Sequence, residues 1–284
     1  MTPPEPRPPF PSPLLAFGLT SLALMLWLMG AMLFFGLGGP VAVAMGSIVG
    51  LGVLGSAAAR LVPPPSDVRL GLRGPELHWL LPALLLLPLV LWTSELDNWI
   101  AVWTARPPRP DEAGPSSLAW LETGIVSVLL LPLLEEFFFR GLLLQGVAQS
   151  MRPLGACVFV GALSAIFGAA AFGTSPETVS VLAIGWVNGT LLGVLRLASG
   201  SLFVPIAWHS ATAALGLLGV ILATDVPVPG FNAPGDHTPA SWLVTAGLPV
   251  AIGLVLLRQR WNARDPLPAL PPREDEEEDE RPFF

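Results

Sequence analysis

A run of charged residues interrupts an apolar segment in the middle of the chain, at residues 132–141 (PLLEEFFFRG). On a helix, Glu136 and Arg140 lie four residues apart on one face, so they can form an ion pair. Glu135 points about 100° away from Glu136 and has no such partner in the sequence. Ionisable groups at membrane depth are costly and usually mark a site, so the pattern predicts a paired Glu136 and a free carboxylate at Glu135 that can act as a general base. The structural alternative is a salt bridge at the membrane interface.

A second candidate is His209, in the apolar stretch FVPIAWHSA. A buried neutral histidine often does no more than bond a backbone carbonyl. Here Pro205 frees a backbone carbonyl one turn earlier, and Glu135 enters the membrane from the same predicted side. The surroundings therefore favour a functional histidine that works together with the glutamate.

The composition indicates that these residues belong to a membrane protein. Of 284 residues, 52% are hydrophobic and 12% are charged, against about 25% charged in soluble domains. The net charge of −7 comes from one acidic run, EDEEEDE at residues 274–280, so no nucleic-acid partner is indicated. The single Cys157 permits no disulfide within the chain.

Apolar segments long enough to cross a bilayer predict an all-α, polytopic membrane bundle of about eight transmembrane helices. The predicted spans are about 14–37, 40–59, 77–93, 118–134, 154–172, 178–195, 201–223 and 241–257. All 14 basic residues are arginine, and 12 of them lie on one side if the N-terminus is cytoplasmic. Since short basic segments stay in the cytoplasm, we expect both termini there, with the protein in the plasma or bacterial inner membrane.

The sequence predicts five regions along the chain. They are a Pro-rich disordered N-terminus (1–13), N-terminal spans with an outer loop (14–117), a core that holds the charged motif and His209 (118–223), an outer loop with the last span (224–257), and an acidic disordered tail (258–284). The two terminal regions are too polar or too rich in proline to bury a core.

Together the two motifs resemble a known family. LLEEFFFRGLL is similar to the EExxxR signature of the CAAX-protease and bacteriocin-processing family of intramembrane endopeptidases, and RLASGSLFVPIAWHS resembles its later histidine segment. The resemblance implies catalytic roles for Glu135, Glu136, Arg140 and His209, with Glu135 activating water. It also implies a peptide or lipidated protein in the membrane as substrate.

Two positions depart from the family pattern. The FxxxH motif has Phe167 but Ala171 in place of the histidine, and Ala213 stands where Asn or Asp is expected after His209. Zinc normally needs three protein ligands, and Glu135 with His209 supplies two, so a divalent metal is poorly supported and no cofactor is indicated.

Two further residues are candidate substitutes for the missing groups. His78 is a candidate third ligand and Asn188 a candidate amide donor, against the alternatives of an interfacial anchor and an interhelical hydrogen bond. His237 is placed on the outer loop, away from the motif.

Three functions follow from the sequence. The first is an active intramembrane endopeptidase, which the retained motifs favour. The second is a catalytically impaired member that binds a peptide or lipid or acts as an immunity-type protein, which Ala171 and Ala213 favour. The third is a transporter or scaffold, which would make the two ordered motifs a coincidence. The sequence does not specify the substrate or the oligomeric state.

Overall fold

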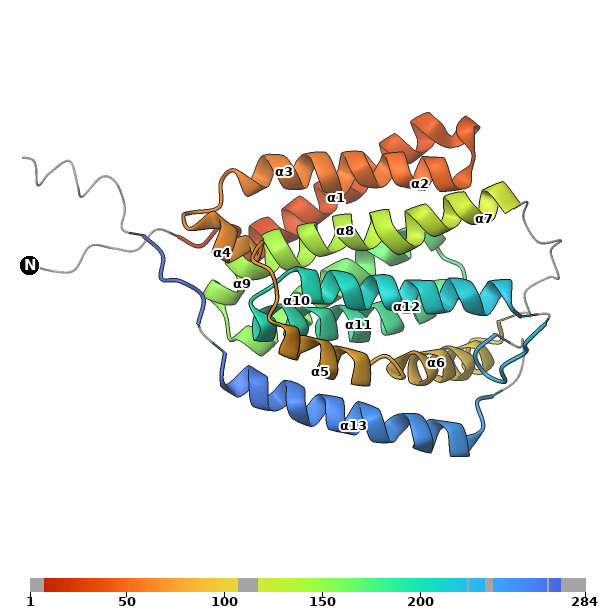
Figure 1. The fold of residues 1–284 in the computed structure, drawn as a ribbon. Coiled ribbons are helices and arrows are strands. Elements are labelled where there is room, and N and C mark those ends of the chain that lie inside the picture. The colour runs from red at the N-terminus through yellow and green to blue at the C-terminus, as the bar shows by residue number, and fades with distance from the viewer. Residues whose placement is uncertain (1–7, 107–116, 224, 233–236, 265, 272–284) are drawn as a thin grey trace, which may run out of the picture.

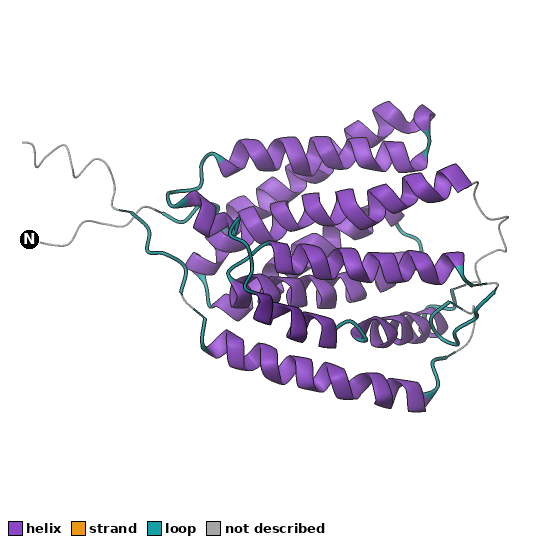
Figure 2. Ribbon diagram, in the orientation of Figure 1, coloured by secondary structure: helices purple, strands orange, loops and turns teal. Residues whose placement is uncertain are grey.

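The computed structural model describes residues 8–106, 117–223, 225–232, 237–264 and 266–271. Every regular element within these residues is a helix (Figure 2). The prediction of an all-α membrane bundle is therefore confirmed. The long α-helices are α1 (Pro13–Phe34), α2 (Gly39–Ser47), α6 (Leu89–Trp103), α7 (Ser117–Gly124), α10 (Pro153–Ala169), α11 (Glu177–Ser199), α12 (Phe203–Ile221) and α13 (Ala240–Asn262).

Shorter helical elements complete the bundle. The α-helical ones are α3 (Leu54–Ala59), α4 (Ser66–Leu70), α5 (Leu80–Leu85), α8 (Leu131–Glu135) and α9 (Leu144–Ser150). The 3₁₀ turns are η1 (Phe35–Leu37), η3 (Leu77–Trp79) and η6 (Ala170–Phe172), and the π-helical turns are η2 (Ile48–Val53), η4 (Ile125–Leu130) and η5 (Glu136–Leu143). Figure 1 shows that the long segments run side by side between the two ends of the molecule.

Seven helical segments of the described chain are long and apolar enough to cross a membrane. Six of them correspond closely to predicted spans. The third differs, because it continues to Trp103 rather than ending at Thr93. Its last part, SELDNWIAVW, is too polar to be identified as a span from the sequence, but the fold gives those polar groups partners.

The predicted span at 118–134 is not among these seven segments. It lies in a continuous helical run from α7 through α9 that carries four ionisable residues, Glu122, Glu135, Glu136 and Arg140. Figure 1 shows that this run passes from one end of the bundle to the other beside α12. Seven apolar segments and this charged run together match the prediction of about eight spans.

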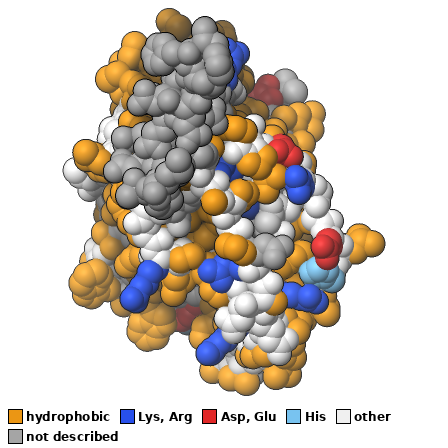
Figure 3. Space-filling view, turned by 90° about the vertical axis from the view of Figure 1, so that its left-hand side faces the viewer, with side chains coloured by type: hydrophobic (Ala, Val, Ile, Leu, Met, Phe, Trp, Pro, Cys, Tyr) orange, Lys and Arg blue, Asp and Glu red, His pale blue; other side chains and the backbone are white. Residues whose placement is uncertain are grey.

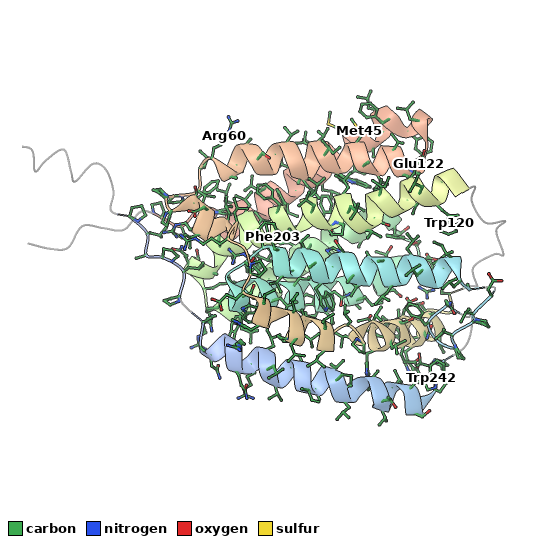
Figure 4. All side chains as sticks on the ribbon, in the orientation of Figure 1. Met45, Arg60, Trp120, Glu122, Phe203 and Trp242 are labelled. Atoms are coloured by element: carbon green, nitrogen blue, oxygen red, sulfur yellow. The ribbon has the colours of Figure 1, made fainter. Side chains whose placement is uncertain are left out.

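Both ends of the described chain lie at one end of the bundle (Figure 1). The side chain of Gln145 donates a hydrogen bond to the carbonyl of Phe10, and Arg69 Nη2 donates to the carbonyl of Ala269 at 2.6 Å. This arrangement is the one that an even number of crossings would produce. Arginine side chains are distributed over this end of the molecule (Figure 3), and Arg60 lies there as well (Figure 4).

The terminal segments are more ordered than the sequence predicted, as far as they are described. Helix α13 continues to Asn262, five residues into the predicted tail, and Leu267 packs against the main hydrophobic core. Phe10 also packs against that core. The acidic run at 274–280 and residues 1–7 lie outside the described residues.

At the opposite end, the outer loop is fastened to α6. His237 Nδ1 lies 2.8 Å from Oε1 of the buried Glu95, and the Thr238 amide donates to Oε2 of Glu95 at 2.9 Å. Ser94 and Asn98 both donate to the carbonyl of Gly230, at 2.7 and 2.8 Å. These bonds satisfy the polar end of α6 and hold His237 in the segment between α12 and α13, away from the charged motif.

Candidate active site

The charged motif forms an ion pair within the helical run. Arg140 Nη1 donates to Oε1 of Glu136 at 3.0 Å, and the side chains are 2% and 0% exposed. The Glu136–Arg140 pair predicted from the four-residue spacing is therefore present in the fold. A pair this deeply buried holds both partners in place, because neither charge can be exposed to water without breaking the packing.

Arg140 also links three segments of the fold. Its Nη2 donates to the carbonyl of Gly189 on α11 at 3.1 Å and to Ser164 Oγ on α10 at 3.3 Å. The side chain thus bridges η5, α10 and α11, and the planar guanidinium is suited to several simultaneous hydrogen bonds. The motif arginine fixes the relative positions of these three segments.

His209 is bonded to Glu136. Its Nδ1 lies 2.9 Å from Glu136 Oε1, the same oxygen that accepts from Arg140. The sequence analysis paired His209 with Glu135 in function, whereas the direct contact is with the neighbouring glutamate. A carboxylate on Nδ1 fixes the ring orientation and leaves Nε2 as the nitrogen available to a ligand.

A cavity of about 310 Å³ lies between these helices. The charged and polar residues among those that line it are Glu135, Arg140, Ser164, Asn188, His209 and Thr212. Within the described residues, no hydrogen bond joins Glu135 to another side chain or backbone group. Glu135 and Glu136 therefore have different environments, as the sequence predicted: one carboxylate faces a cavity, and the other is held in an ion pair.

The small residues of the lining explain why the space is open. Ala165 and Gly168 of α10, Gly185 and Gly189 of α11, and Ala213 of α12 face it with a methyl group or no side chain. Larger side chains at these positions would fill the volume. The cavity is thus lined by polar groups from several helices over a surface of small residues, which is the usual form of a small binding site.

Two positions that the sequence analysis singled out do not line the cavity. His78 lies 2.9 Å from Glu76 and against the ring of Trp79, and it does not line the cavity. Ala171 is exposed in η6, beyond the end of α10. Position 171, where the family pattern has a histidine, therefore does not line the cavity.

Ser164 was not identified from the sequence. It occupies the cavity side of α10, donates to the carbonyl of Gly161 at 3.0 Å and accepts from Arg140. The available signal was a single hydroxyl in the otherwise apolar span at 154–172. Thr212 was also missed, and its hydroxyl donates to the carbonyl of His209 at 2.9 Å.

The residues present do not fit a resident metal ion. Among the described residues, no three His, Cys, Asp or Glu side chains are grouped as metal ligands. Glu136 Oε1 is already shared by Arg140 and His209. Zinc sites normally use three protein ligands, so Glu135 and His209 alone make an incomplete set.

Comparison with known families identifies part of the chain. Residues 117–215 match the family described as type II CAAX prenyl endopeptidase Rce1-like, over about a third of the sequence. No curated protein and no solved structure gives a significant match. The matched residues contain the whole helical run of the charged motif together with α10, α11 and most of α12. The resemblance to the CAAX-protease family is therefore confirmed for the part of the chain that forms most of the cavity lining.

Proposed function

We propose that this membrane protein is an active intramembrane endopeptidase that uses Glu135 as its general base. Residues 117–215 match the type II CAAX prenyl endopeptidase Rce1-like family, which supports this proposal. The observation that carries the proposal is the position of Glu135. Its carboxylate faces the cavity with no hydrogen-bond partner among the described residues, beside a histidine that is held by a second carboxylate. A base must be free to accept a proton, whereas a positioning group must be held.

The proposed reaction is hydrolysis of a peptide bond. Glu135 takes a proton from water, and the resulting hydroxide attacks the carbonyl carbon of the scissile bond. Negative charge then develops on the carbonyl oxygen, where the protonated ring of His209 donates through Nε2. When the C–N bond breaks, the proton held by Glu135 passes to the leaving amine.

Glu136 and Arg140 position these groups in the proposed mechanism. Glu136 holds His209 through Nδ1, and Arg140 pairs with Glu136 while it fixes α10 and α11. The proposed substrate is a peptide or lipidated protein that reaches the cavity from the membrane. We place the end that holds both described termini in the cytoplasm, because the arginine bias of the sequence favours that orientation.

One observation favours the non-catalytic alternative. Ala213 lines the cavity as a methyl group where the family pattern has Asn or Asp, and α10 contributes Ser164 rather than a histidine. A protein with this cavity could bind a membrane peptide without cleaving it. The same experiment separates the two functions, because binding without cleavage would support only the alternative.

The test is cleavage of a quenched fluorescent peptide library by the full-length protein in nanodiscs. We expect cleavage by the wild type, a loss of about 10²–10⁴-fold in Glu135→Gln, which removes the base, and no effect of a chelator. Glu122→Gln is the matched control, since Glu122 lies on the same helical run near the opposite end of the bundle (Figure 4) and outside the cavity. Cleavage that survives Glu135→Gln, or that Glu122→Gln reduces equally, would overturn the proposed role of Glu135.

A further inference from the structure

Asn188 is placed in the cavity with an unused carboxamide. It lies on α11 and lines the same space as Glu135 and His209. Its Oδ1 is buried without a hydrogen-bond partner, and no described residue accepts from its amide nitrogen. An unsatisfied amide in a buried site is unfavourable, because the group has given up its hydrogen bonds to water without replacing them. The interhelical hydrogen bond that would give Asn188 a purely structural role is absent among the described residues.

The backbone next to Asn188 is tightly fixed. A Cβ at Gly189 would lie 2.7 Å from Ser164 Oγ and 3.0 Å from Gly161 Cα, so α10 and α11 are in direct contact there. The carbonyl of Gly189 also accepts from Arg140. The rotation of α11 is thereby set by its neighbours, and the Asn188 side chain is held on the cavity side.

The opposite wall of the cavity lacks an amide. Ala213 lies one turn after His209 on α12 and contributes only a methyl group. The other lining hydroxyls are engaged, since Thr212 donates to the His209 carbonyl and Ser164 donates to Gly161. Within the described lining, the neutral donors without a partner are the Asn188 amide on α11 and the indole Nε1–H of Trp208 on α12. Of these two, Asn188 carries the carboxamide that position 213 lacks.

We infer that Asn188 is a catalytic residue whose amide donates, together with His209, to the carbonyl oxygen of the scissile bond. Asn188 thereby supplies from α11 the hydrogen-bond donor that is missing at position 213 of α12. This inference rests on the proposed endopeptidase function. Two donors from different helices would hold the oxyanion between them, and such an interaction is strongest in the transition state.

The experiment measures kcat and KM for the peptide of the library that the wild type cleaves fastest. Asn188→Ala is expected to lower kcat by about 10²–10³-fold, the usual effect of removing one oxyanion donor. KM should change by less than about threefold, because the interaction forms mainly in the transition state. Adding Ala213→Asn to Asn188→Ala should recover at least about tenfold of the lost kcat, since an amide then enters the same cavity from α12.

Thr20→Val is the matched control, because it removes a buried hydroxyl on α1 that already bonds the carbonyl of Ala16 and lies outside the cavity. It is expected to leave kcat within about threefold, and thermal unfolding of every variant detects any loss of folding. Wild-type kcat in folded Asn188→Ala would overturn the inference while the endopeptidase function stands. A loss of kcat that follows a loss of folding, without recovery by Ala213→Asn, would overturn it in favour of a structural role. If the wild type shows no Glu135-dependent cleavage, the proposed function fails, and the role of Asn188 fails with it.

Discussion

Glu136 is the most constrained ionisable group of the site. One oxygen, Oε1, accepts from Arg140 at 3.0 Å and contacts His209 Nδ1 at 2.9 Å, while Oε2 is buried without a partner. Glu135, its neighbour in sequence, faces the cavity instead. Adjacent residues on a helix point in different directions, so the two glutamates can take opposite tasks, one as a reactive group and one as a support.

This division predicts different consequences for the same substitution at the two positions. Glu136→Gln removes the negative charge that compensates the buried Arg140, and we expect the free energy of unfolding to fall by about 3 kcal/mol. Glu135→Gln removes no hydrogen bond, so its stability should stay near that of the wild type. Peptide cleavage should fall in both variants. The measurement is thermal unfolding in detergent followed by the fluorescence of the ten tryptophans, alongside the cleavage assay.

Glu122→Gln again serves as the control and should alter neither unfolding nor cleavage. Equal unfolding temperatures for Glu136→Gln and the wild type would show that the ion pair contributes no stability. A lower unfolding temperature for Glu135→Gln would contradict the free state assigned to that carboxylate.

The contact between α10 and α11 decides where several of these groups lie. Gly161 and Gly189 face each other across it, and a Cβ at Gly161 would lie 2.7 Å from the Thr190 amide nitrogen. Small residues let membrane helices approach closely. The rings of Phe139 and Phe167, with centroids 5.7 Å apart, hold η5 against the same α10. The helical run, α10 and α11 are therefore packed as one unit around Arg140.

We predict that the substitution Gly189→Ala pushes α10 and α11 apart. The added methyl group would meet Ser164, Arg140 and the backbone of Gly161, and overpacking of this kind lowers stability by about 1–3 kcal/mol. Cleavage should also fall, because both Arg140 and Asn188 depend on the position of α11. Thermal unfolding and kcat of the variant are the measurements.

Gly216→Ala on α12 is the control for this change. A Cβ at Gly216 would have no heavy atom within 4 Å beyond its own local backbone, so the substitution should keep or slightly raise stability, by up to about 1 kcal/mol from helix propensity. If Gly189→Ala is as stable as Gly216→Ala, the helices have more room than the structure shows.

The two ends of the bundle differ in the chain segments that they bring together. Both described ends of the chain meet at one end of the bundle, where Arg69 bonds Ala269, and the outer loop is fastened to α6 at the other. The exposed Arg60 lies at the first end, with Trp120, Glu122 and Trp242 toward the second (Figure 4). From this arrangement we predict an even number of crossings, with the charged helical run as one of them.

Cysteine labelling tests both the orientation and that crossing. In a Cys157→Ser background, Gly36→Cys and Ala105→Cys should react with a membrane-impermeant maleimide in intact cells. Arg60→Cys and Ser150→Cys should react only after permeabilisation. All four positions are exposed in the structure, whereas the native Cys157 is fully buried.

The reverse pattern would contradict the cytoplasmic placement of the termini. The same accessibility at 105 and 150 would contradict a crossing by the run between them. The wild type, whose single cysteine is buried, should react poorly on either side and measures the background.

Much of this protein could be predicted from the sequence, because its features are local. Six of the predicted spans match apolar helices, and the Glu136–Arg140 pair follows from a four-residue spacing that any helix produces. The third predicted span ended early at Thr93, because hydropathy could not anticipate that the outer loop satisfies Glu95 and Asn98.

The sequence by itself determined the membrane class, the charged motif on a helix and the presence of a histidine within reach of it. Only the tertiary structure decided that His209 bonds Glu136, that Ser164 rather than position 171 faces the cavity, and that Asn188 lies there without a partner. The reason is physical. The spacing of side chains along one helix is fixed by the geometry of that helix. The depth and rotation of one helix against another depend on close contacts such as that of Gly161 with Gly189. These contacts form only when all the helices pack together.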